Sequence, residues 1–237
     1  MHRLVPWLLV ACVFGCAHNT VKPVSESREA PPPRPAIVLV YDPEFRAADV
    51  VENQSTASLA VSPNSGQDDR DTVGKQAAAA FASKLVEDIK KLGVQAERAG
   101  PGTPVPANAL VVVAKFIDVD EGNRMKRLVV GFGSGASRVD ARVQLFAAST
   151  KLLEFDTHSD SGKMPGGGVT LGLGVLVIGP VTAVDAISDV ASGAMKAHAT
   201  AIEKLAAKSG AQASHYLSEY FGKQGWIAAD RVKTANQ

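Results

Sequence analysis

The chain has 237 residues, of which 46% are hydrophobic and 21% are charged, and its formal net charge is +1. This balance lacks the basic excess of proteins that neutralise phosphate backbones, so no nucleic-acid partner is expected. The length is sufficient for one domain with a sizeable core. Both cysteines, Cys12 and Cys16, lie near the start, so the rest of the chain offers no thiol for a disulfide, a metal site or a nucleophile.

The first residues are typical of a secretion signal. Arg3 precedes an apolar stretch from Leu4 to Phe14, which is too short to span a bilayer comfortably. The pair Gly15-Cys16 follows this stretch and resembles a bacterial lipoprotein signal. We therefore expect residues 1–15 to be removed and Cys16 to carry diacylglycerol and an acyl chain such as palmitate.

Cys12 is a competing lipid site, since Leu9-Val10-Ala11 before it also fits a lipoprotein signal. Cleavage before Cys12 would leave an apolar core shorter than usual, so Cys16 is favoured. An ordinary cleaved signal or a short anchor is the third alternative. No aspartate follows Cys16, which favours the outer membrane with the protein facing the periplasm. The polar, proline-rich residues 16–35 predict a flexible tether.

The first half of the domain alternates between strands and a helix. A short β-branched run from Ala36 to Tyr41 predicts a buried strand, and residues 44–71 predict a long loop with one short strand at 58–61. Apolar residues at helical spacing predict a helix that begins at Thr72 and ends at Gly93. A weak strand at 94–99 and a central strand at 110–117 follow.

The second half adds a hairpin and a long helix. From Val139 to Leu145 apolar and polar residues alternate, which predicts a half-solvated strand that pairs with residues 151–158. Residues 182–221 predict a helix with a break at Ser209-Gly210. Residues 225–237 predict a loose tail, with docking of Trp226 on the domain as the alternative. This order predicts one α+β domain over residues 36–224, a single mixed or antiparallel sheet packed against helices.

Three glycines, Gly131, Gly133 and Gly135, follow an apolar pair and raise the question of phosphate binding. A dinucleotide fingerprint needs a G-x-G-x-x-G spacing and a helix directly after it, whereas here the spacing is G-x-G-x-G and a strand follows. We therefore expect no nucleotide and no other cofactor. The glycines are interpreted as structural, allowing a strand to bend or lie close to another backbone.

The same region resembles a known family. Gly122-Asn123-Arg124, Arg127 and the run from Gly131 to Ser137, followed by an alternating strand, are similar to the DUF4410 family over roughly residues 36–222. The resemblance implies an α+β fold in a small bacterial envelope protein, often a lipoprotein, and no established activity. The chain departs from the usual pattern at its hairpin turn, where Ala147-Ala148-Ser149-Thr150 contains no glycine.

Few residues are candidates for chemistry. The basic cluster Arg124, Lys126 and Arg127 is a candidate contact for an anion, a lipid headgroup or a partner, or else a solvated loop. The histidines of the folded part, His158, His198 and His215, lack the spacing of metal ligands. No nucleophile elbow is present. We expect no metal, no catalytic residue and no enzymatic activity.

The segment 166–187 is rich in glycine and carries no charge from Gly166 to Val184. Three interpretations remain open: a membrane span, partial insertion or self-packing through small residues, and a buried arm that leads into the final helix. The leading functional expectation is an outer-membrane lipoprotein whose periplasmic domain binds an envelope protein or associates with itself. The alternatives are an oligomeric pore or export subunit that inserts residues 166–187, and an envelope hydrolase.

Overall fold

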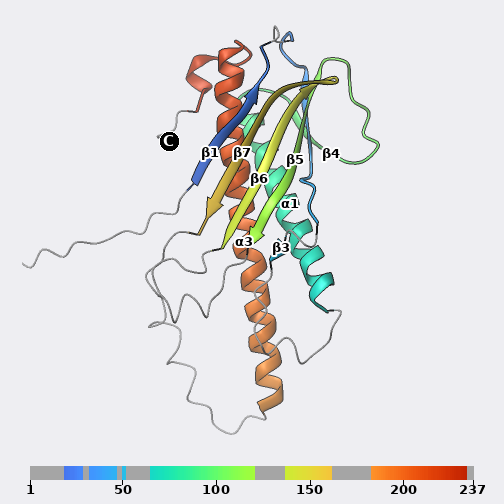
Figure 1. Cartoon of the computed structure of the whole chain (residues 1–237), viewed down its shortest axis with the longest axis vertical. Coiled ribbons are helices and arrows are strands. Elements are labelled where there is room, and N and C mark those ends of the chain that lie inside the picture. The colour runs from blue at the N-terminus through green and yellow to red at the C-terminus, as the bar shows by residue number, and fades with distance from the viewer. Residues whose placement is uncertain are drawn as a thin grey trace, which may run out of the picture.

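The computed structural model describes residues 19–28, 32–46, 50–51, 65–120, 137–161 and 183–233 (Figure 1). The strands are β1 (Asn19–Glu26), β2 (Ile37–Tyr41), β3 (Val50–Val51), β4 (Ala96–Ala99), β5 (Ala109–Asp120), β6 (Arg138–Ala147) and β7 (Thr150–Asp160). The helices are α1 (Ser65–Lys91), α3 (Ala183–Lys223) and the 3-10 helix η3 (Ala229–Arg231).

The strands form one mixed sheet. Its order is β1-β7-β6-β5-β2-β4, and β3 pairs with the end of β5. The neighbours from β1 to β5 are antiparallel, whereas β2 is parallel to both β4 and β5. The chain explains this difference, because a short turn joins β6 to β7 while β2 reaches β4 through helix α1. The predicted α+β fold with a single mixed sheet is confirmed.

Alternation along the strands sorts the side chains between two faces. In β6, Val139, Ala141, Val143 and Leu145 are fully buried, whereas the residues between them are partly or fully exposed. The buried face packs against α1 and α3, which both lie on one side of the sheet (Figure 1). No helix in the described ranges covers the opposite side, which we call the outer face. The predicted alternation is therefore correct, and it leaves one face open.

Helix α3 is continuous through Ser209 and Gly210, so the predicted break is wrong. A Cβ atom on Gly210 would lie 2.5 Å from the backbone oxygen of Phe81 in α1. The glycine is therefore a contact point between the helices. On the neighbouring side, the hydroxyls of Ser209 and Thr157 lie 2.7 Å apart, which ties α3 to β7.

Helix α1 begins at Ser65, seven residues before the predicted start at Thr72. Its first turns are polar and lack the apolar periodicity on which the prediction rested, so the pattern marked only the packed part of the helix. The expected long loop is therefore shorter, and it also contains β3. The short strand expected at 58–61 lies outside the described residues.

Within the predicted tether 16–35, residues Asn19–Glu26 form the edge strand β1. They pair with β7 from Asn19 opposite Ser159 to Glu26 opposite Leu153. Most side chains of β1 are exposed, and an edge strand can be held by backbone hydrogen bonds without an apolar pattern. The ordered sheet therefore begins three residues after Cys16.

The predicted loose tail is wrong as far as Lys233. The side chain of Trp226 is only 4% exposed and packs edge-on against Tyr220, with 5.8 Å between the ring centroids. Arg231 donates a hydrogen bond to the backbone oxygen of Leu92, and Lys233 forms an ion pair with Asp88 at 3.1 Å. The tail thus joins the C-terminal end of α3 to the end of α1.

Candidate binding surface

The outer face carries a row of charged side chains across four strands. Strand register places Lys22, Asp156, Arg142 and Lys115 in one row from β1 to β5. The Arg142 guanidinium donates two hydrogen bonds to Asp156, at 2.8 and 3.0 Å. The same guanidinium lies 3.6 Å from Glu154, which also pairs with Lys151. We call Arg142, Lys151, Glu154 and Asp156 the charge ladder.

Pairing favours the ionised forms of Arg142 and Glu154. The hydrogen bonds to Asp156 raise the pKa of Arg142 above its ordinary value. The hydrogen bond from Lys151 lowers the pKa of Glu154, and this effect outweighs the opposing effect of desolvation. Exposed pairs of this kind contribute little to stability, roughly 0–1 kcal/mol each. The ladder therefore gives the outer face a fixed pattern of alternating charge that a partner with complementary charges can match.

The next row along the strands places His158 between two carboxylates. Its Nδ1 atom lies 2.5 Å from Asp140 on β6, and its Nε2 atom lies 3.5 Å from Asp160 on β7. The imidazole is about one-third exposed and stands on the open sheet. Within the described ranges, no group of three histidine, cysteine or carboxylate side chains is placed to hold a metal ion.

The sequence drew attention to His158 but not to its neighbour Asp140. The signal for Asp140 lay in the hairpin register, since pairing β6 with β7 brings residue 140 opposite residue 158. Arg138 forms a further ion pair with Asp118 on β5, at 3.1 Å. Asp140, His158 and Asp160 face outward because the residues beside them on β6 and β7, such as Val139 and Thr157, are buried on the opposite face.

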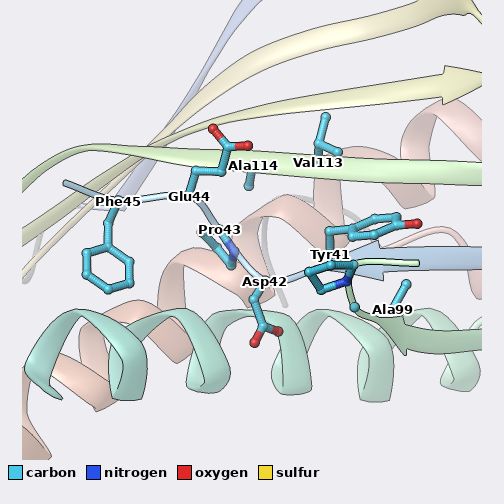
Figure 2. A pocket seen from close by; sticks show the side chains of 10 residues that line it. Tyr41, Asp42, Pro43, Glu44, Phe45, Ala99, Val113 and Ala114 are labelled. Carbon is cyan, nitrogen blue, oxygen red and sulfur yellow. The ribbon is translucent and has the colours of Figure 1, made fainter. Parts of the chain in front are cut away.

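A shallow groove opens beside the charge ladder, where the parallel strands β2 and β4 end (Figure 2). Its volume is about 540 Å³. Figure 2 shows Tyr41 and Ala99 at one end of the groove, Val113 on β5 above it, and Phe45 at the other end beside helix α1. The carboxyl ends of parallel strands are a common location for ligands, because the connections that follow diverge there.

Two contacts fix the walls of the groove. The guanidinium of Arg98, at the end of β4, donates hydrogen bonds to both carboxylate oxygens of Asp42, the shorter at 2.7 Å. The backbone of Glu44 runs beside β5, donating to the oxygen of Ala114 at 2.8 Å and accepting from the nitrogen of Phe116 at 2.9 Å. The lining is therefore mainly apolar, with the carboxylates of Asp42 and Glu44 on the segment that follows β2. This arrangement suits an apolar side chain of a partner.

Further apolar side chains lie on the outer face of β5, on either side of the exposed Lys115. Val111 and Val113 are half-buried on the outer face, and Ile117 further along is 47% exposed. Together with the groove, these side chains give the outer face an apolar area that is a candidate contact for a partner. The outer face thus combines apolar contacts on β5 with charged contacts on β6 and β7.

The site residues predicted from the sequence lie outside the described residues. This holds for the lipid site Cys16, for the basic cluster Arg124, Lys126 and Arg127, and for the structural glycines Gly131, Gly133 and Gly135. The basic cluster and the glycines belong to the connection between Asp120 at the end of β5 and Ser137 before β6.

The described part of the segment 166–187 is helical. Residues 166–182 lie outside the described residues, whereas residues 183–187 form the first turns of α3. No helix in the described ranges combines the length and the apolar character that a membrane crossing requires.

Comparison with known proteins identifies one family. The family described as a domain of unknown function, DUF4410, matches residues 38–177. No curated protein matches the chain. Among solved structures, the PelC dodecamer from Paraburkholderia phytofirmans is similar at 11% identity with a TM-score of 0.36, covering 81% of this chain and 94% of PelC. A variant of that dodecamer matches at 12% identity with a TM-score of 0.33, covering 63% of this chain and 86% of the other.

Proposed function

The chain belongs to the DUF4410 family, and from that starting point we propose that it is an outer-membrane lipoprotein whose periplasmic domain binds another envelope protein or a second copy of itself, without catalysing a reaction. The lipid attachment is supported by Gly15-Cys16 at the end of a short apolar stretch. The binding role is carried by one observation, the open outer face of the sheet.

This surface has the composition of a protein-binding site. Ile117 and the groove around Tyr41 provide apolar contacts, and the charge ladder beside them provides orientation. Protein interfaces commonly combine an apolar centre with polar surroundings. The groove is open and shallow, whereas small-molecule sites usually enclose most of their ligand.

The lipid attachment is tested on the full chain expressed in a Gram-negative host. The mass of the N-terminal peptide is expected to match an acylated Cys16, and a Cys16→Ala variant is expected to move from the membrane to the soluble periplasmic fraction. An unmodified N-terminus in the wild-type protein would refute acylation. A variant that stays in the membrane after salt and carbonate washes would show a second anchor, and would favour the alternative in which residues 166–187 insert.

The binding surface is tested by photo-crosslinking in the same host. A photoreactive amino acid at Ile117 is expected to give a discrete crosslinked product, which mass spectrometry then assigns to a partner or to a second copy. The matched control is the same amino acid at Lys90, an exposed residue on helix α1 at the opposite side of the sheet. Equal products at both positions, or none at Ile117, would contradict the proposal.

A further inference from the structure

The first strand places the expected lipid site close to one end of the sheet. Strand β1 begins at Asn19, three residues after Cys16. A fully extended chain spans at most about 3.6 Å per residue, so these residues separate the lipid from the sheet by no more than about 11 Å. A tether that ended at residue 35 would instead have let the domain stand far from the membrane.

Several strands share this end of the sheet. Asn19 lies opposite Ser159 near the end of β7, which in turn lies opposite Val139 near the start of β6. Val139 pairs with Val119 near the end of β5. Backbone and side-chain hydrogen bonds between Ser137 and Ser161 close the same end of the hairpin. We call this the anchor end.

Helix α3 projects beyond the anchor end. Ser209 is hydrogen-bonded to Thr157 on β7, which fixes the helix against the sheet. From Ser209 back to Ala183 the helix extends about 39 Å, at 1.5 Å per residue. Strand β7 extends only about 10 Å from Thr157 to its end at Asp160. The N-terminal part of α3 therefore extends several helical turns beyond the end of the sheet, as Figure 1 shows.

If the domain stands on its anchor end, these two distances are compatible only when α3 reaches the membrane. The spacer of about 11 Å is much shorter than the projection of the helix. With the lipid in the bilayer, the projecting turns cannot fit upright between the sheet and the membrane surface. Their sequence, residues 183–200, contains three charged residues, Asp185, Asp189 and Lys196, and is otherwise mostly small or apolar. Such a composition suits contact with lipid headgroups and the adjoining acyl region.

A flat orientation on the outer face is less favourable. It would press the charge ladder against the lipids and remove water from ion pairs such as Arg142–Asp156. Desolvating paired charges costs more than their mutual attraction returns unless every group keeps its partners. The anchor end therefore offers the better contact.

We propose that the anchor end of the sheet faces the phospholipid bilayer and that residues 183–200 of helix α3 contact it. This rests on the acylation of Cys16 proposed above. The far end of the sheet, with the turn at Ala148-Ser149, then stands about 33 Å from the anchor end, given the length of β7 and about 3.3 Å per residue. The outer face is left upright and accessible to a partner.

The test uses the acylated full chain in vesicles of phosphatidylethanolamine and phosphatidylglycerol. Single cysteines replace Thr20 at the anchor end, Ala194 in the projecting part of α3 and Ser149 at the far turn, and each is labelled with the environment-sensitive fluorophore NBD. Cys16 does not react because its sulfur carries the lipid. Lipids with a nitroxide headgroup are expected to cause a several-fold loss of fluorescence at residues 20 and 194, and almost none at residue 149.

The outcomes separate this orientation from acylation itself. If the N-terminal peptide lacks its lipid and no label is quenched, the proposed function fails. If the peptide is acylated and the vesicles retain the protein, quenching at residue 149 as strong as at residue 20 overturns the orientation, and so does a lack of quenching at residue 194. Labelled Asn19→Cys replaces Thr20→Cys if the latter unfolds at a lower temperature than the wild type.

Discussion

Ala148 occupies the left-handed region of the backbone, with φ at 50°, in the turn between β6 and β7. In this region the Cβ atom crowds the following carbonyl oxygen, at a cost of roughly 1–2 kcal/mol for residues other than glycine. Sequence analysis noted that this turn lacks the glycine usual in the family. The hairpin thus forms in spite of its turn residue, because the buried apolar side chains of both strands fix the register.

We expect Ala148→Gly to stabilise the protein. The gain should be about 0.5–1 kcal/mol, since relief of the strained conformation is partly offset by the greater freedom of glycine in the unfolded chain. Denaturant unfolding of the two proteins measures the difference. Ser149→Gly is the matched control, because Ser149 is not among the described residues with positive φ, and it should lower stability slightly. A lower stability for Ala148→Gly would contradict the argument.

Asp88 is a charged residue almost fully buried between the two helices and the C-terminal segment. It accepts hydrogen bonds from Lys84 at 2.8 Å and from Ser214 at 3.1 Å, and it pairs with Lys233 at 3.1 Å. Burial by itself raises the pKa of Asp88, but the hydrogen bonds and charges of Lys84 and Lys233 outweigh it and hold the pKa below the ordinary value.

A lowered pKa makes the contribution of Asp88 depend on pH. The ionised carboxylate stabilises the folded state above the ordinary pKa of about 4, and the stabilisation is lost as the pH falls from there through the lower folded value. We expect Asp88→Asn to cost about 2 kcal/mol at pH 7, since hydrogen bonds to charged groups are worth about that much. Urea unfolding at pH 7 and pH 3 should show a large difference that shrinks in acid.

The control for this pair of measurements is Glu87→Gln on the same helix. Glu87 is exposed and pairs with Lys91 in solvent, so its replacement should change stability little. A constant difference between wild type and Asp88→Asn across the pH range would show that the variant acts through packing.

At the scale of elements, the crossing of α1 and α3 depends on the missing side chain of Gly210. Alanine favours a helix over glycine by about 1 kcal/mol, so helix propensity alone predicts that Gly210→Ala stabilises the protein. The added Cβ atom would meet the backbone oxygen of Phe81 at 2.5 Å, and backbone cannot rotate away. We expect a net loss of about 1–2 kcal/mol, because overpacking usually costs more than the propensity gain.

Gly74 in α1 provides the matched comparison. A Cβ atom there would meet the Phe45 ring at 2.4 Å, but a half-buried side chain can turn aside. Gly74→Ala should therefore cost clearly less than Gly210→Ala in thermal unfolding. The reverse order would show that the two helices separate more easily than their contact implies.

The elements that the sequence predicts well are those whose pattern comes from burial. Strands β5 and β6 alternate because one face packs on α1 and α3, and both lie within a few residues of their predicted bounds. Strand β1 was missed because an edge strand of exposed residues, including Lys22 and Pro23, carries no such pattern. The break expected at Gly210 was wrong because glycine marks a close helix contact as well as a helix end.

The candidate site was less predictable than the strands, because its residues come together only when the strands pair. The groove at Tyr41 and the pairing of His158 with Asp140 depend on which strands become neighbours, and neither depends on a local motif. Trp226 packs beside Tyr220 and Phe221, the alternative that the sequence left open, whereas the ordering of the residues that follow as far as Lys233 was not predicted. A short segment with a single anchoring side chain has no periodicity that a sequence pattern can detect.

At the scale of the whole molecule, β1 pairs with β7, which joins the first described strand of the chain to the last. We expect a chain that starts at residue 29 to be less stable by several kcal/mol than one that starts at Asn19, because backbone pairs with β7 are lost at about 1 kcal/mol per hydrogen bond. It should also aggregate, since β7 would present a free edge. Denaturant unfolding and light scattering measure both effects. Equal stability and equal light scattering of the two chains would instead support a flexible tether over residues 16–35.

The pairing of β1 with β7 also determines how the molecule responds to force. If Cys16 is held in a membrane and a partner pulls the domain away, the load enters at Asn19 and runs along the strand direction. The ladder between β1 and β7 is then loaded in shear, so that its hydrogen bonds share the force and must break together. The attachment is therefore mechanically stiff, and a pull on the domain is transmitted to the membrane with little extension.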